Sequence, residues 1–175
     1  MRKLRAIANY AKGLNMHGAD PEIFDCVEDK MKWHKFEPRT VSKRVIQLIE
    51  NVDRSLLTPK EEFCLDLFLF SYYAGGMVNV DVCHLTYNMI QGNQVIYEPL
   101  LIEKSKQIIE KHEGQGIDNY VFPVFTKKHT TEAKMRNRVI QISNRVSKTL
   151  TKVCNILDIK EDITWYSARD TFISR

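Results

Sequence analysis

The segment from Thr58 to Ile90 limits the possible folds of this chain more than any other. Between Phe63 and Tyr73 it is apolar at nearly every position. A helix that is apolar all round is covered by other helices, because it has no face to present to water. Thr58 and Glu61 have the spacing of a capping box, with proline at the first helical position, and predict where this helix begins. The segment therefore predicts a mainly helical fold around one buried helix.

Two glycines, Gly75 and Gly76, are predicted to end this helix. Glycine readily takes the left-handed conformation that a helix C-terminus often requires. Asn79 can then cap a second helix, which would carry Val82, Leu85 and Met89. The sequence thus predicts two helices that meet at a glycine corner inside the core.

Length and composition indicate one globular domain, or one domain with a piece of another attached. The chain has 175 residues and is 43% hydrophobic, which is enough for a substantial core. Its longest apolar run, Leu65 to Phe70, is interrupted by Asp66 and is too short to cross a bilayer. Neither a secretion signal nor CxxC spacing is present, so we expect a cytoplasmic protein with reduced thiols. The cysteines are Cys26, Cys64, Cys83 and Cys154.

A domain boundary is predicted near the N-terminus. Apolar residues at helical spacing predict a basic amphipathic helix over residues 2–15. The following segment begins with a Gly-Ala-Asp-Pro break and has little periodicity. We therefore expect the end of an N-terminal domain at residues 1–17, a linker at 18–38 and a second domain at 39–175.

The second domain is predicted to be helical with a small antiparallel sheet. A short helix follows Thr40 or Ser42, either of which can cap it. A Gln-Gly-Asn turn precedes a predicted strand from Gln94 to Tyr97. Apolar residues three and four apart predict further helices near residues 104–112 and over 131–157.

The longest predicted helix and the residues just before it are strongly basic. Between Lys127 and Lys152 there are eight basic residues and one acid, Glu132, while the whole chain has a net charge of +4. A basic stripe beside an apolar stripe suits the phosphate backbone of DNA, whereas a merely solvated face normally mixes signs. Arg138 and Arg145 are seven apart and should share one face. The expected DNA-binding residues are Lys127, Lys128, Lys134, Arg136, Arg138, Arg145 and Lys148.

Two motifs carry a resemblance to a known family. The segment from Gly76 to Leu85, GMVNVDVCHL, resembles the G-[LM]-R-x-x-[DE]-[LV]-x-x-L segment of tyrosine-type site-specific recombinases, the phage integrase family. The segment from Thr164 to Phe172, TWYSARDTF, resembles the T-x-H-x-[LA]-R-H-[ST]-F box of that family. The residues of these segments are most similar to those of integrases of Bacteroides-type mobile elements. The resemblance covers residues 38–175.

This resemblance implies the catalytic-domain fold of the family, which is mainly α with a small antiparallel β-sheet. It also implies that double-stranded DNA is cut and rejoined through a 3′-phosphotyrosyl intermediate, within a homotetramer when the protein is full length. Arg169 matches the second catalytic arginine, and Tyr166 stands at the position of the histidine. Phosphotyrosine chemistry conserves bond energy, so we expect no cofactor, nucleotide or metal. The helix at residues 2–15 resembles the last helix of the DNA-clasping N-terminal domain, although a solvated helix that packs on its neighbour would have the same pattern.

The sequence departs from the family pattern at several positions. Val78 occupies the place of the first arginine, and Asp170 replaces a frequent histidine. Tyr166 can donate a hydrogen bond but is a poorer base than histidine. The hairpin that bears the catalytic lysine in the family is either deleted here or missing from the sequence. The nucleophilic tyrosine of the family falls beyond Arg175, so we expect a catalytic domain truncated before its nucleophile.

Two other functions remain open on the sequence. A recombinase-derived protein that lacks the arginine at Val78 and the lysine hairpin would bind DNA without cutting it. A helical interaction domain would not bind DNA at all, although the basic segment from Lys127 to Lys152 argues against it. The histidines show no HxxxH or HExxH spacing and no Walker or GxGxxG loop is present, so neither a metal nor a nucleotide is predicted.

Overall fold

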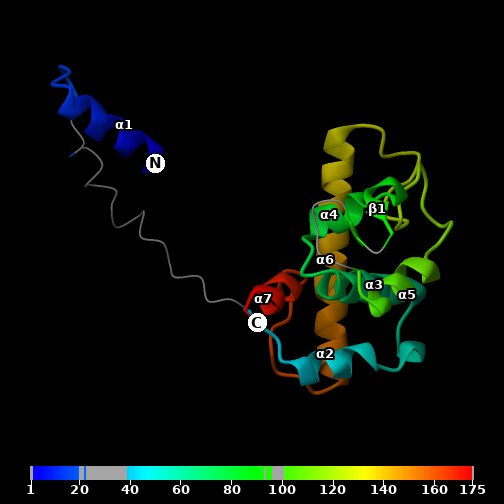
Figure 1. Ribbon diagram of the computed structural model, residues 1–175. Helices are drawn as coiled ribbons and strands as arrows, with labels where there is room; N and C mark the ends of the chain where they lie inside the picture. Colours follow the sequence, from blue (N-terminus) through cyan, green and yellow to red (C-terminus); the bar gives the residue numbers. More distant parts are fainter. Residues whose placement is uncertain (1, 20–21, 23–38, 93, 96–100, 175) are drawn as a thin grey trace. The chain divides into compact units, whose positions relative to one another are not determined.

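The computed structural model describes residues 2–19, 22, 39–92, 94–95 and 101–174 (Figure 1). The chain divides into two compact units, Met1–Glu37 and Pro38–Arg175. Most of the predicted linker, together with Cys26 and His34, lies outside the described residues.

Unit 1 contains the helix α1 (Arg2–Gly13), which is the helix predicted over residues 2–15. Asn15 follows it in the left-handed conformation, with φ of 53°. Three apolar side chains at helical spacing, Ile7, Tyr10 and Leu14, are exposed on this unit.

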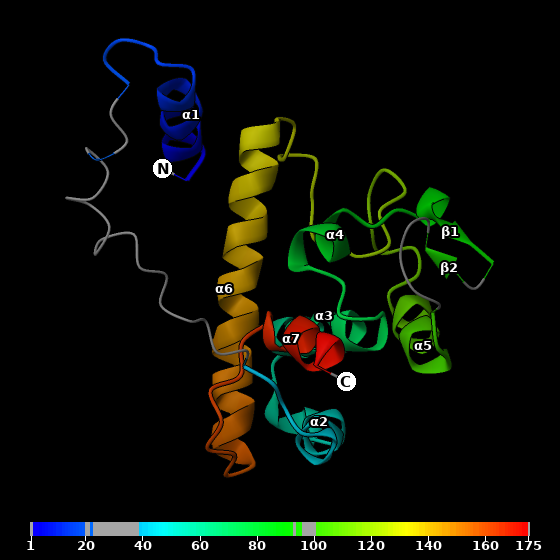
Figure 2. The same ribbon diagram turned by 60° about the vertical axis from the view of Figure 1, so that its left-hand side comes forward.

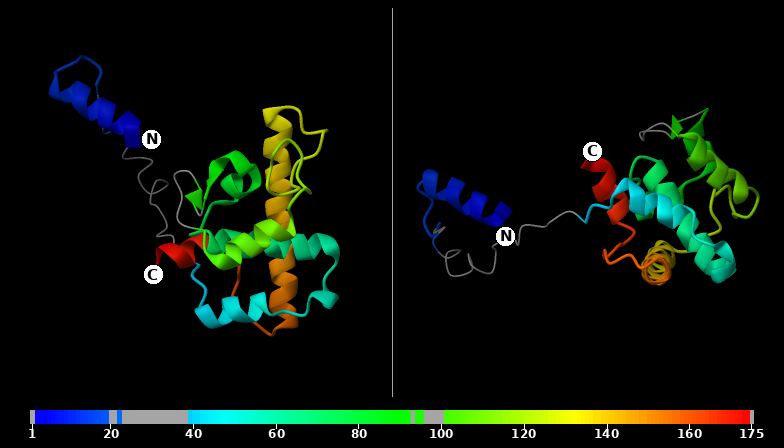
Figure 3. Two further views of the ribbon diagram at one scale, coloured as in Figure 1. Left: turned by 45° about the vertical axis from the view of Figure 1, so that its right-hand side comes forward. Right: turned by 90° about the horizontal axis from the view of Figure 1, so that it is seen from below.

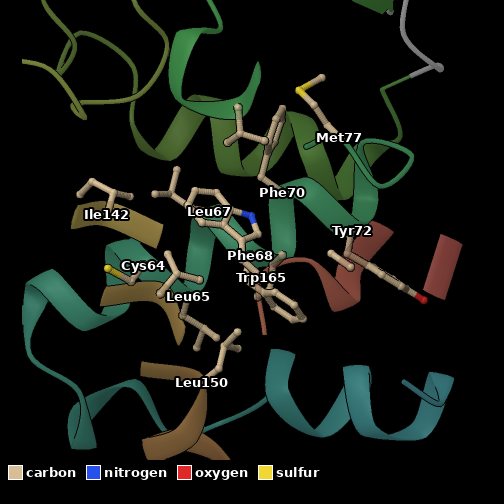
Figure 4. Close-up of a cluster of buried hydrophobic side chains, with 14 of the residues drawn as sticks. Cys64, Leu65, Leu67, Phe68, Phe70, Tyr72, Met77, Ile142, Leu150 and Trp165 are labelled. Atoms are coloured by element: carbon tan, nitrogen blue, oxygen red, sulfur yellow. The ribbon is translucent and has the colours of Figure 1, made fainter. Parts of the chain in front are cut away.

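Unit 2 is built around α3 (Pro59–Tyr73), as the sequence predicts. Thr58 caps this helix through a complete capping box: its hydroxyl accepts from the Glu61 amide, and the Glu61 carboxylate accepts from the Thr58 amide at 2.8 Å. Every residue from Cys64 to Tyr72 is buried. Figure 4 shows side chains of α3 packed together with Trp165 and with residues of the longest helix. The buried central helix is therefore confirmed.

Other helices surround α3 (Figures 2 and 3). It packs against α4, α5, α6 and α7, and the chain of unit 2 is mainly α, as predicted. The α-helices are α2 (Lys43–Glu50), α4 (Asn79–His84), α5 (Glu103–Lys111), α6 (Glu132–Ile156) and α7 (Ser167–Ile173), and the short 3-10 helices are Arg54–Leu56 and Tyr87–Met89. None of the helices in the described ranges combines the length and the apolar character needed to cross a membrane.

The described strands form one short hairpin. Strands β1 (Ile90–Gln91) and β2 (Gln94–Val95) run antiparallel, with Ile90 opposite Val95. Gly92 lies in the connecting turn at φ of 61°, a value that favours glycine. Residues 96 and 97 of the predicted strand lie outside the described residues.

Two details of the predicted helices differ from the structure. Asn79 does not cap α4, because Val78 holds the cap position and the Asn79 side chain donates instead to Ser143 Oγ at 2.7 Å. The helix also ends at His84 instead of continuing to Met89. Its continuation is prevented by pairing with a distant segment, since the Leu85 carbonyl accepts from the Val121 amide at 2.9 Å.

A buried carboxylate interrupts the apolar surface of α3. Asp66 is only 2% exposed, and its Oδ2 lies 3.0 Å from His112 Nε2 and 2.7 Å from Lys111 Nζ. Its Oδ1 lies 3.2 Å from Arg54 Nη1. Burial alone would raise the pKa of Asp66, but these hydrogen bonds and the charges of Lys111 and Arg54 hold it below its usual value. We call these four residues the Asp66 cluster. It connects α5 and the 3-10 helix Arg54–Leu56 to α3.

Candidate nucleic-acid interface

The helix α6 presents the predicted basic segment on a rigid support. Thr131 caps it, with its hydroxyl accepting from the Lys134 amide at 3.3 Å, and Leu157 forms the other cap. One side of the helix is buried in the core through Val139, Ile142, Val146, Leu150 and Val153. Both predicted ends of the helix are confirmed.

Most basic residues of α6 fall on a single face. At 100° per residue, Lys134, Arg138, Arg145, Lys148 and Lys152 lie within about 80° of one another around the helix axis. Lys134, Arg145 and Lys148 are exposed. No carboxylate of the described residues forms an ion pair with any of these three. We call Lys134, Arg138, Arg145 and Lys148 the α6 basic face.

Arg138 is held in a fixed orientation on this face. Its Nε donates to the carbonyl of Val124 at 2.8 Å, and the side chain is half-buried. Burial, and then the charge of Arg145, lower the pKa of Arg138. The two guanidinium groups therefore repel each other, so a bound anion would relieve this repulsion.

Lys152 is neutralised at the far end of the stripe. Its Nζ lies 2.8 Å from Glu61 Oε2 of the capping box. This hydrogen bond, together with those from Thr58, lowers the pKa of Glu61 to about 2. The unpaired charge on α6 therefore ends at Lys148.

Arg136 belongs to a different side of α6. Its Nη2 lies 3.0 Å from Glu132 Oε1, one turn earlier. Both residues border a groove of about 810 Å³ between α4 and the first half of α6. Val80 and Ile140, which are 48% and 53% exposed, also line this groove. The structure thus separates Arg136 from the other basic residues with which the sequence grouped it.

Lys127 and Lys128 are exposed in the turn that precedes α6. His129 closes this turn, since its amide donates to the Thr126 carbonyl and its Nδ1 accepts from the Thr126 amide, both at 2.9 Å. The two lysines therefore lie close to the N-terminal end of α6. Their charges add to the partial positive charge of the helix dipole at that end.

Arg169 lies on α7, directly against the glycine corner. The two motif segments of the sequence therefore touch, although they are 93 positions apart. Arg169 Nη1 approaches the Gly76 carbonyl at 3.4 Å. A Cβ added at Gly76 would lie 2.9 Å from the Arg169 Cα, so only glycine fits there.

Tyr166 and Val78 flank this corner in sequence. Tyr166 is 53% exposed at the cap position of α7, three residues before Arg169 and hence on a neighbouring turn. Val78 is half-buried at the cap position of α4 and offers no charge to an anion.

The beginning of unit 2 is hydrogen-bonded to α7, a feature that sequence reasoning missed. The Arg39 amide donates to Asp170 Oδ2 at 3.1 Å, and the Val41 amide donates to Thr171 Oγ1 at 2.8 Å. Asp170 therefore binds a backbone amide, a role that its charge alone did not suggest. The available signal was the threonine of the motif, because buried hydroxyls require hydrogen-bond partners.

Comparisons with known proteins give no assignment. No family model matches the chain, and no curated protein or solved structure is significantly similar to it. Within the described ranges, no group of three or more His, Cys, Asp or Glu side chains is arranged to hold a metal ion.

Proposed function

We propose that unit 2 binds the phosphate backbone of double-stranded DNA through the α6 basic face. The observation that carries this proposal is the row of exposed cations, Lys134, Arg145 and Lys148, without acidic partners among the described residues. Surface charges that serve only solubility normally alternate in sign and pair with neighbours. From Lys134 to Lys148 the row is about 21 Å long, which spans several phosphates of a duplex.

We further propose that this unit is the catalytic-domain portion of a tyrosine-type recombinase of a mobile element. Contact between Gly76 and Arg169 supports this, because both motif segments of the resemblance meet at one corner. The mainly helical architecture is compatible with the recombinase catalytic domain, in which the β1–β2 hairpin would belong to the small antiparallel sheet. The complete protein would then act as a tetramer on DNA.

The chemistry proposed for this corner is stabilisation of charge on a phosphate. A guanidinium can bind two non-bridging oxygens at once, so Arg169 would stabilise the charge that develops during phosphoryl transfer. Tyr166 would donate a hydrogen bond to the same group. This chemistry would use neither a metal nor a nucleotide.

A DNA-binding protein without cleavage activity is the second candidate. Val78 favours it, because valine at the cap position of α4 replaces the first phosphate-binding arginine of the resemblance and offers no charge to a phosphate. Both candidates share the α6 basic face and differ only in the chemistry at Arg169.

The test of DNA binding is reversal of charge on the α6 basic face. We expect Arg145→Glu/Lys148→Glu to weaken binding to every duplex alike, since phosphate contacts carry no sequence information. Affinity should be measured by fluorescence anisotropy over a range of salt concentrations. The slope of log affinity against log salt should fall by about 2 in magnitude, because two phosphate contacts are lost.

A matched control is available on α2. Lys43 and Arg44 are adjacent exposed cations, so Lys43→Glu/Arg44→Glu changes the net charge equally at another place. This control should retain most of the affinity and the salt slope. Equal weakening by both double variants would mean that net charge alone attracts DNA, and the proposed interface would be rejected.

A further inference from the structure

The residues that open unit 2 are fixed to the helix that carries Arg169. Arg39 and Val41 are joined to α7 by two hydrogen bonds that span more than a hundred positions of sequence. Both bonds use backbone amides as donors and side chains of α7 as acceptors. They therefore fix the position of the helix backbone, whichever side chains stand at positions 39 and 41.

The Thr171 hydroxyl both accepts and donates a hydrogen bond in this arrangement. Its hydroxyl accepts from the Val41 amide at 2.8 Å and donates to the Ser167 carbonyl at 2.6 Å. The residue is buried, so water cannot replace either bond. Asp170 adds the second link through the Arg39 amide, and an ion pair between Arg39 Nη1 and Asp162 Oδ2 at 3.0 Å supports that link.

The opposite restraint on α7 comes from the glycine corner. Gly76 lies so close to the backbone of Arg169 and to Phe172 that α7 cannot move toward it. The links from Arg39 and Val41 oppose movement of the helix away from the core. Arg169 is thus carried by a short helix whose position is set by two parts of the chain at once.

We propose that Asp170 and Thr171 are positioning residues for Arg169, and that the start of unit 2 sets where this guanidinium meets a DNA phosphate. This inference rests on the proposed function. Neither residue touches the phosphate, because both side chains bind the backbone at residues 39 and 41. Their effect on DNA must therefore pass through Arg169.

A double-mutant cycle with Arg169→Ala and Thr171→Val tests this coupling. Affinity for a 25-base-pair duplex of arbitrary sequence is measured at low salt; the length is about two helical turns. In the parent, Arg169→Ala should lower affinity by about 10- to 100-fold, as expected for a charged hydrogen bond. With Thr171→Val present, the same change should lower affinity less than about 2-fold, because contacting residues are not additive. Thr171→Ser keeps the hydroxyl and should restore the full effect of Arg169→Ala.

A second variant guards against loss of folding. Asp170→Ala removes the more exposed link to Arg39, and circular dichroism establishes that each variant is folded. Asp170→Ala should also reduce the effect of Arg169→Ala. If Thr171→Val does not fold, the cycle with Asp170→Ala alone decides between coupling and additivity.

The possible failures are distinguishable. Additive effects of Arg169→Ala and Thr171→Val, or of the Asp170 pair when only that one folds, would overturn the positioning role while leaving DNA binding intact. If Arg145→Glu/Lys148→Glu weakens binding but Arg169→Ala has no effect, the inference fails and the α6 basic face survives. If the Arg145/Lys148 reversal has no effect on binding, the proposed function itself is rejected, and the inference with it.

Discussion

At the scale of single residues, Gly76 has little freedom to change. Its φ of 75° favours glycine, and an added Cβ would lie 3.1 Å from the Phe172 Cβ as well as 2.9 Å from the Arg169 Cα. Gly114 has nearly the same conformation, with φ of 72°, but an added Cβ there meets nothing within 4 Å. Comparing substitutions at the two positions therefore separates the effect of backbone conformation on stability from the effect of packing.

We predict that Gly76→Ala destabilises unit 2 more than Gly114→Ala does. The left-handed conformation should cost both variants about 1 kcal/mol in free energy of unfolding. At Gly76 the steric clash with α7 should add about 2 kcal/mol, as in an overpacked core. Urea denaturation followed by circular dichroism measures both values. Equal losses would show that α7 can move away from the corner.

The role of Gly76 could be predicted only in part. A pair of glycines after an apolar run indicates a helix end, and the structure confirms it, with the Gly76 amide donating to the Ser71 carbonyl at 2.9 Å. Contact with Arg169 left no local signal, because it depends on the tertiary packing of α7. The signal for this contact was instead that both motif segments resemble parts of the same catalytic domain.

At the scale of secondary-structure elements, the Asp66 cluster joins helices that the hydrophobic core alone would hold less specifically. Asp66 ionises more readily than usual because of its hydrogen bonds to His112 and Lys111. Its folded pKa is thus below the unfolded one, so its contribution to stability is complete above pH 4 and is lost as the pH falls through the folded pKa.

We predict that Asp66→Asn lowers the free energy of unfolding at pH 7 by about 3 kcal/mol, because cations would remain there without their buried partner. The difference between parent and variant should shrink as the pH falls below 4. Urea denaturation at pH 7, 5, 4 and 3 checks this. The exposed carboxylate Asp81 provides the control, since Asp81→Asn should change stability little at any pH. A difference for Asp66→Asn that is the same at every pH would contradict the prediction.

The helix α6 shows why an element can be predicted better than the roles of its side chains. Its ends and its buried face follow from local capping and periodicity, and both are confirmed. The partners of its cations come from elsewhere in the fold: Lys152 binds Glu61 and Arg138 binds the Val124 carbonyl. Only Arg136, with Glu132 one turn away, had a partner that the sequence could have revealed.

At the scale of the whole molecule, the hydrophobic core of the described residues belongs to unit 2. Its buried members run from Val41 to Ala168, and none comes from unit 1. The domain boundary predicted at residue 38 was based on a break in periodicity. Local periodicity predicted the helix α1 but not that Ile7, Tyr10 and Leu14 are exposed on unit 1.

We predict that residues 38–175 fold without residues 1–37. The fragment and the whole chain should have the same free energy of unfolding within about 0.5 kcal/mol, because the hydrophobic core of the described residues lies entirely in unit 2. Circular dichroism of both proteins in urea provides the comparison. A fragment that unfolds at clearly lower urea concentration would show that unit 1 stabilises the core.

The burial of α3 has a consequence for the nascent chain during its synthesis. This helix packs against α4 and α5, which follow it closely in the chain, but also against α6 and α7, which are synthesised much later. Until Ser167–Ile173 has left the ribosome, part of an almost wholly apolar helix has no cover, and such surfaces promote aggregation. Nascent chains of unit 2 are therefore expected to depend on chaperones until nearly the last residue of α7 has been added.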